Sequence, residues 1–246
     1  MNPLELTPLP SSEVPILKDP FFDYSDFFFF LAISVPCIFL ALLPVRLFRV
    51  FIPVSTSVQL LVVQGIWYFL LFGCVALLFR IRYQRPFWQS LGWRTISLTS
   101  VAGAIIAGPL LAFAIGLLGS GLRAPKIDLP FEELLGSRGA LVLIGIIVVV
   151  LGPIAEELAF RGFLMPLLIR SMGTAAGGIV LTGLIFGSVH GYEYRWSWQY
   201  ILLISLAGCI FGWAKYKTQS TAASALMHST FNLLQFVAFL TQTKTV

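Results

Sequence analysis

The chain has 246 residues, of which 58% are apolar and 11% are charged, and its mean hydropathy is +0.90. This composition is typical of a polytopic membrane protein and excludes a soluble domain built around a large core. The net charge of +5 is typical of arginines and lysines that flank membrane spans, so we expect membrane lipids and not nucleic acid as partners. The three cysteines lie in apolar runs without C-x-x-C spacing, which predicts buried thiols.

The chain divides into an acidic tail, residues 1–26, and a single hydrophobic domain, residues 27–246. Apolar runs in this domain predict an all-α bundle of seven transmembrane helices, or eight if the fourth breaks in two. The linker at residues 80–94 combines four arginines with several aromatic residues and is typical of a segment that anchors at the membrane interface. The predicted spans, in chain order, are residues 27–45, 58–79, 96–118, 140–170, 174–190, 200–216 and 220–240.

The fourth span carries charged residues where a membrane helix rarely has them. Glu156, Glu157 and Arg161 follow the apolar run ALVLIGIIVVVL, although a charge at the bilayer centre costs roughly 2.5–3.5 kcal/mol. Glu157 and Arg161 are four residues apart, so they share a helix face and can form an ion pair. Glu156 points about 100° away and has no such partner. Its charge therefore calls for another helix, water or a metal, and Gly152 with Pro153 predicts a kink beside it.

The two histidines of the chain lie on later spans. His190 closes the fifth span with Phe186 four residues earlier, and His228 lies in the seventh with Asn232 four residues later. A carboxylate and an imidazole can together deprotonate a water, while a second imidazole and an amide can stabilise an oxyanion. The same residues suggest a metal alternative, in which Glu156, His190 and His228 hold zinc. The spacing alone leaves both alternatives open.

These residues form three motifs that occur in order on successive hydrophobic segments. Together the motifs resemble the CAAX protease and bacteriocin-processing enzyme (CPBP) family of intramembrane endopeptidases, over about residues 140–240. The resemblance implies a helical bundle with a polar cavity embedded in the membrane, and the hydrolysis of peptide bonds. The motifs are E-E-x-x-x-R (Glu156, Glu157, Arg161), F-x-x-x-H (Phe186, His190) and H-x-x-x-N (His228, Asn232).

The resemblance also implies a role for each motif residue. Glu156 and His190 would activate the water, and His228 and Asn232 would stabilise the oxyanion. The remaining motif residues would support the site, Glu157 and Arg161 as an ion pair and Phe186 as a wall of the cavity. Although the family was long described as metalloproteases, we favour a glutamate-dependent mechanism that requires no cofactor. Zinc at Glu156, His190 and His228 is the alternative.

The resemblance implies a membrane-associated peptide or protein as the substrate, including lipidated ones. A chain of this length without added soluble domains is similar to prokaryotic members, so we expect a multi-pass protein of a prokaryotic cell membrane. Three other functions compete with proteolysis. They are a non-catalytic immunity or scaffold protein of the same family, a haem protein with His190 and His228 as axial ligands, and a transporter that uses Glu156 as a proton site.

Overall fold

The structure, a computed structural model, describes residues 20–48, 55–127 and 138–243. Over these ranges the chain is helical without a β-strand, which confirms the predicted all-α fold. Residues 1–19 of the predicted acidic tail lie outside these ranges. The α-helices are α1 (Tyr24–Phe48), α2 (Thr56–Leu78), α3 (Phe87–Ser90), α4 (Leu98–Gly121), α5 (Arg138–Gly145), α6 (Gly152–Glu157), α7 (Met165–Met172), α8 (Ala175–Val189), α9 (Trp198–Thr218) and α10 (Thr221–Thr243).

Within the described residues, six helical segments are long and apolar enough to cross a membrane. The expected fifth span forms α8, which is apolar but has only 15 residues. The helical bundle therefore matches the predicted class of an integral, multi-pass membrane protein. The six segments are Tyr24–Phe48, Thr56–Tyr83, Leu98–Gly121, Gly139–Met172, Trp198–Thr218 and Thr221–Thr241.

The fourth span is one continuous rod and does not break into two spans. It runs through α5, α6 and α7, which are joined by two π-helical segments, Ile146–Leu151 and Leu158–Leu164. In the first of these, the N–H of Gly152 donates to the carbonyl of Ile147, five residues earlier. Because the wider turn tolerates the missing N–H of Pro153, the proline alters the helix type without ending the helix.

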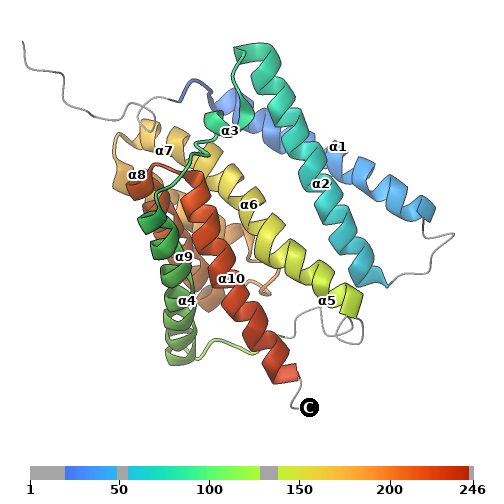
Figure 1. Ribbon diagram of the computed structural model, residues 1–246, viewed down its shortest axis with the longest axis vertical. Helices are drawn as coiled ribbons and strands as arrows, with labels where there is room; N and C mark the ends of the chain where they lie inside the picture. Colours follow the sequence, from blue (N-terminus) through green and yellow to red (C-terminus); the bar gives the residue numbers. More distant parts are fainter. Residues whose placement is uncertain (1–19, 49–54, 128–137, 244–246) are drawn as a thin grey trace, which may run out of the picture.

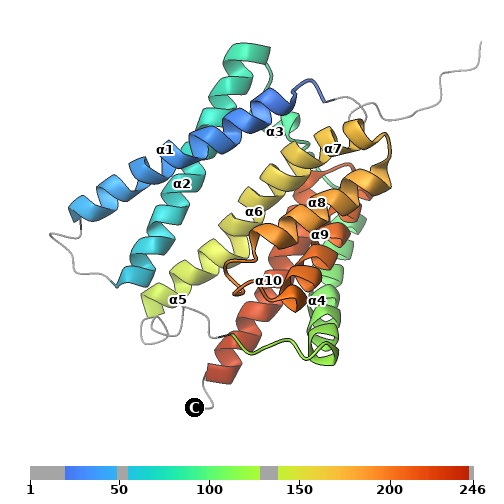
Figure 2. The ribbon, with the colours of Figure 1, turned by 180° about the vertical axis from the view of Figure 1, so that it is seen from behind.

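The rod lies between two groups of helices (Figures 1 and 2). The pair α1 and α2 lies on one side, and α4, α8, α9 and α10 lie on the other. Glycines let the helices of the larger group approach closely. A methyl group built on Gly108 of α4 would overlap Thr230 and the backbone of α10, and one built on Gly187 of α8 would overlap Ser205 of α9.

A cluster of buried aromatic rings fixes the α1–α2 pair to the rod. The ring of Phe163, which is fully buried, contacts the rings of Phe22, Phe30 and Phe79 at centroid distances of 4.9–5.8 Å. Such edge-on pairs add stability beyond the apolar area that they bury. The cluster places the start of α1 and the end of α2 beside the C-terminal half of the rod.

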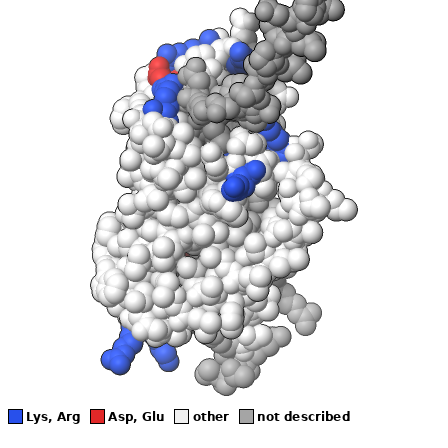
Figure 3. Space-filling view, turned by 90° about the vertical axis from the view of Figure 1, so that its left-hand side faces the viewer, with Lys and Arg blue, Asp and Glu red and all other residues white. Residues whose placement is uncertain are grey.

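A buried carboxylate adds a polar link at the same end of the bundle. Asp26 lies inside α1, fully buried, although the predicted boundary placed it in the tail. It accepts hydrogen bonds from Arg82 and from the hydroxyl of Tyr83, each at 2.7 Å. The face shown in Figure 3 is largely uncharged, and most of the Lys and Arg visible on it lie towards its two ends.

Candidate active site

Glu157 and Arg161 form an ion pair that is buried completely. Arg161 Nη1 donates to Glu157 Oε1 at 2.8 Å, and both side chains are 0% exposed. Arg161 Nη2 donates to the carbonyl of Gly208 at 2.7 Å, and the ring of Phe186 lies 4.5 Å from the guanidinium carbon. The i,i+4 spacing on the rod thus produces the pair that the sequence predicts. The pair joins the rod to α8 and α9.

The Glu157 carboxylate also holds His228 of α10 in place. His228 Nδ1 lies 3.0 Å from Glu157 Oε1, and the imidazole stacks on Phe211 with ring centroids 4.4 Å apart. The hydroxyl of Ser224, one turn before His228, donates to Glu157 Oε2. Because a carboxylate can only accept, this arrangement assigns the proton of the neutral imidazole to Nδ1. Nε2 is then the atom available for chemistry.

Glu156 points away from this ion pair, as its position on the helix predicts. Its side chain is 26% exposed, and its Oε2 lies 3.8 Å from His228 Nε2. That distance is too long for a hydrogen bond but allows a water to contact both atoms. The resemblance paired Glu156 with His190, whereas the imidazole within 4 Å of Glu156 is that of His228.

His190 caps the end of α8 and lines the same cavity as Glu156. Its Nδ1 lies 2.7 Å from the carbonyl of Phe186, which directs Nε2 away from the helix. The ring of Phe186 contacts both imidazoles, with centroid distances of 4.7 Å to His190 and 5.8 Å to His228. The ring of Phe186 therefore packs against both histidines and forms part of the cavity wall.

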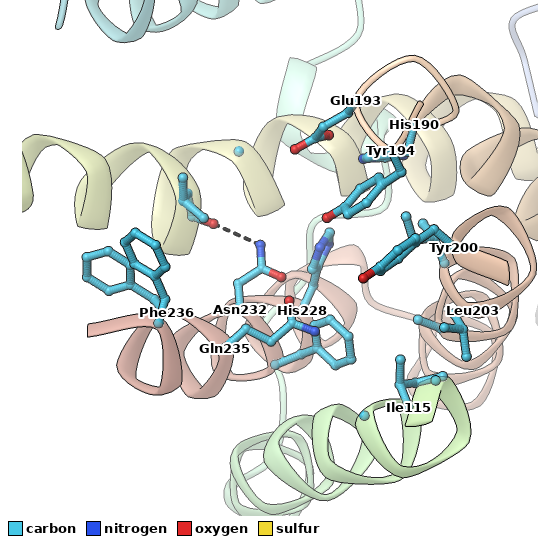
Figure 4. Close-up of a pocket in the computed structure, with 18 of the residues that line it drawn as sticks. Ile115, His190, Glu193, Tyr194, Tyr200, Leu203, His228, Asn232, Gln235 and Phe236 are labelled. Carbon is cyan, nitrogen blue, oxygen red and sulfur yellow. Dashed lines mark hydrogen bonds between the residues drawn. The ribbon is translucent and has the colours of Figure 1, made fainter. Parts of the chain in front are cut away.

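Asn232 supplies a hydrogen bond that the rod itself cannot make at Pro153. In the π-helical register, the carbonyl of Val148 would accept from residue 153, which is a proline without an N–H. Asn232 Nδ2 donates to this carbonyl at 2.8 Å (Figure 4). The amide keeps a second N–H on Nδ2 that can donate to another group. The break at Pro153 thus fixes the orientation of a predicted site residue on a different helix.

These residues line a cavity of about 790 Å³ between the rod, α4, α8, α9 and α10. Figure 4 shows His190, His228 and Asn232 around this cavity, together with Glu193, Tyr194 and Tyr200. Tyr194 and Tyr200 stack at 4.6 Å, and burial followed by the charge of Glu193 raises the pKa of Tyr194. The Tyr194 phenol therefore stays protonated at neutral pH and can donate a hydrogen bond.

Sequence reasoning missed Ser224 and the residues between α8 and α9. Ser224 could have been found, because it precedes His228 by four residues on the same face of an apolar helix. Glu193 and Tyr194 gave no such signal, since they lie in a turn whose position in space depends on the packing of α8 against α9.

The zinc alternative requires Glu156, His190 and His228 to converge on one point. Among the described residues, no three side chains of His, Cys, Asp or Glu converge closely enough to hold a metal ion. Glu156, His190 and His228 line one cavity, and the Nδ1 contact with Glu157 leaves Nε2 of His228 free, but the three side chains do not converge on one point as a ligand set requires. No chemical step is therefore assigned to a metal.

The fold and the site define a polytopic helical membrane protein in which carboxylates, imidazoles and a carboxamide surround an embedded cavity. Residues 138–234 match the family model described as Type II CAAX prenyl endopeptidase Rce1-like. The match begins with α5, ends within α10 and contains all seven motif residues, which confirms the resemblance to the CAAX protease family. No curated protein and no solved structure matched the chain.

Proposed function

We propose that the protein is an intramembrane endopeptidase that hydrolyses peptide bonds of membrane-associated or lipidated substrates. The observation that carries the proposal is the position of Glu156, whose carboxylate faces the cavity 3.8 Å from an imidazole that a second carboxylate orients. The family match supports a CAAX-type protease at the level of the family. The activity and the residue roles are our inference from the geometry.

In the proposed reaction, a water between Glu156 and His228 gives a proton to Glu156 and attacks the carbonyl carbon of the peptide. The second N–H of Asn232 donates to the resulting oxyanion, while the unprotonated Nε2 of His228 accepts a hydrogen bond from the attacking water and orients it. Glu156 then returns the proton to the leaving amine as the C–N bond breaks. His190 contributes from the end of α8, where its free Nε2 can accept a hydrogen bond from the water or the amine.

The cavity is large enough to admit a short segment of a peptide chain beside Glu156. Its volume of about 790 Å³ lies within the usual range of about 300–1,000 Å³ for ligand sites, and it extends from Glu156 to residues of α4 and α9. A membrane-embedded site favours substrates that a lipid group or an apolar segment holds at the bilayer. A prenylated CAAX peptide is therefore the first substrate to test.

The test is cleavage of quenched fluorogenic peptides, including a prenylated CAAX peptide, by the detergent-purified chain. We expect Glu156→Gln to lower the rate by about 10²–10⁴-fold, because the substitution keeps the shape of the side chain but removes its basic oxygen. Asp23→Asn is the matched control. It makes the same chemical change at the exposed start of α1, where Asp23 caps the helix by accepting from Ser25.

Wild-type cleavage that Glu156→Gln abolishes and Asp23→Asn preserves supports the proposal. Cleavage at the wild-type rate by Glu156→Gln would remove Glu156 from the mechanism. If the wild type cuts no peptide while Glu156→Gln retains the function of the wild type in cells, the chain is a scaffold and not a protease. An absorption spectrum of the same samples tests the haem alternative, since two axial histidines would give a Soret band.

A further inference from the structure

A second cavity, of about 430 Å³, lies at the end of the bundle where α3 meets the C-terminus of α9. Three cationic side chains line it, those of Arg85, Arg94 and Lys215. Within the described part of the chain, its lining contains no carboxylate. The cavity is separate from the candidate active site, and nothing in the proposed proteolysis uses it.

Lys215 is the unusual member of this group. It lies in the last turn of α9 and is only 2% exposed, so it does not extend to solvent as lysines at helix ends usually do. Its ammonium packs against Gly92, where an added methyl group would lie 3.2 Å from Nζ. Gly92 also has φ of +70°. Glycine is therefore favoured there both by its backbone conformation and by the close approach of Lys215.

The cationic groups of this cavity have no protein partner among the described residues. The side chains of Lys215, Arg94 and Arg85 make no hydrogen bond or ion pair there, although Arg85 lies over the ring of Phe21 at 5.8 Å. A buried ammonium without a counter-charge is costly, because burial removes its hydration. A second cation beside it increases the cost. An anion inside the cavity would remove both penalties.

The position of the cavity indicates where this anion comes from. The residues beside it include Trp88 and Trp93, whose rings pack at 5.2 Å, and Trp88 is 51% exposed. Tryptophans of this kind mark the level of the lipid head groups. At this level the most abundant anion is the phosphate of a phospholipid.

We propose that this cavity binds a phosphate group through Lys215, Arg94 and Arg85, and that an anionic phospholipid supplies it. Arginine donates to phosphate oxygens in a fork, and lysine adds a point charge. The bound head group would hold α3 and the linker after it against the ends of α9 and α10. This inference is independent of the proposed peptide hydrolysis.

The test counts lipids on the full chain by native mass spectrometry in dodecylmaltoside, with dioleoylphosphatidylglycerol as the probe. We expect one lipid to be retained tightly by the wild type. Lys215→Met and Arg94→Gln should each raise its dissociation constant by about 10- to 100-fold, the usual effect of losing a charged hydrogen bond. Lys217→Met is the matched control, because Lys217 is exposed two residues later on the same helix and does not line the cavity.

A second arm separates the lipid from free phosphate. The melting temperature of the lipid-depleted protein is measured with inorganic phosphate and with chloride at equal ionic strength. A rise with phosphate that Lys215→Met abolishes supports a site for the phosphate group itself, and lipid retention without that rise assigns the site to the lipid. An equal weakening of lipid binding by Lys217→Met, or no response to either probe, would overturn the proposal. Lys215→Met removes a buried unpaired charge, so we expect it to fold.

Discussion

Replacement of Glu157 by glutamine tests the centre of the site most directly. Glu157 Oε1 accepts from Arg161 at 2.8 Å and contacts His228 at 3.0 Å, and Oε2 accepts from Ser224. The Arg161 and Glu157 side chains are fully buried, and that of His228 is 5% exposed. Glutamine keeps the shape but directs an NH₂ group at one of these donors. It also leaves the Arg161 cation without a counter-charge, and breaking a buried pair in this way costs about 3–5 kcal/mol.

The assay is thermal unfolding in detergent. For a chain of this size, 1 kcal/mol corresponds to about 2–4 °C, so the midpoint should fall by roughly 6–20 °C. Peptide cleavage should also fall, because His228 loses the negatively charged partner that fixes its ring and its tautomer. The loss of a carboxylate that orients a histidine lowers turnover by about 10⁴-fold in serine proteases. Unfolding at the wild-type temperature would refute the stability argument.

The double variant Glu157→Gln with Arg161→Met separates charge balance from orientation. Because it removes both charges, and apolar replacements of buried pairs are often neutral, we expect it to recover most of the lost stability. Cleavage should stay low, since His228 still lacks its carboxylate partner. If the double variant cleaved peptide at the wild-type rate, Glu157 would be only a counter-ion to Arg161.

Three further variants and treatments have defined outcomes. Gly108→Ala should destabilise the protein by about 1–3 kcal/mol in thermal unfolding, because its methyl group would overlap α10. Gly103→Ala on the same helix should have little effect, because its methyl group would enter open space. Equal effects of the two substitutions would contradict this prediction. Asn232→Ala should cost about 1–3 kcal/mol by leaving the Val148 carbonyl unpaired, as well as slowing cleavage, and an unchanged melting temperature would contradict this. Cleavage should persist after EDTA treatment and removal of zinc, and activity that returned only with added zinc would support the metal alternative.

The features that depend on local spacing could be predicted from the sequence. The apolar runs predicted the helical bundle, because a span needs a fixed length of apolar residues whatever its neighbours are. The Glu157 and Arg161 pair followed from an i,i+4 spacing on one helix. The order of the three motifs indicated the protease family that residues 138–234 match.

The features that depend on packing between helices could not be predicted in this way. The sequence placed Glu156, His190 and His228 on three spans without deciding which imidazole lies closer to the glutamate. That choice is made by α10, whose Ser224 and His228 both reach Glu157. At Pro153 the rod likewise receives a hydrogen bond from Asn232 of α10. The sequence of the fourth span alone could therefore not predict that the helix continues through the proline.

The short length of α8 has a consequence for the supply of water. Its 15 residues span about 22 Å, against a hydrocarbon core of about 30 Å. The helix therefore stops at His190 while α4 and α10 continue, and the turn that follows brings Glu193 and Tyr194 to the cavity. The cavity also reaches Lys126, beyond the end of α4. The proposed hydrolysis consumes one water in each turnover, and the polar side chains of Lys126, Glu193 and Tyr194 in the cavity lining offer a route by which that water can reach Glu156.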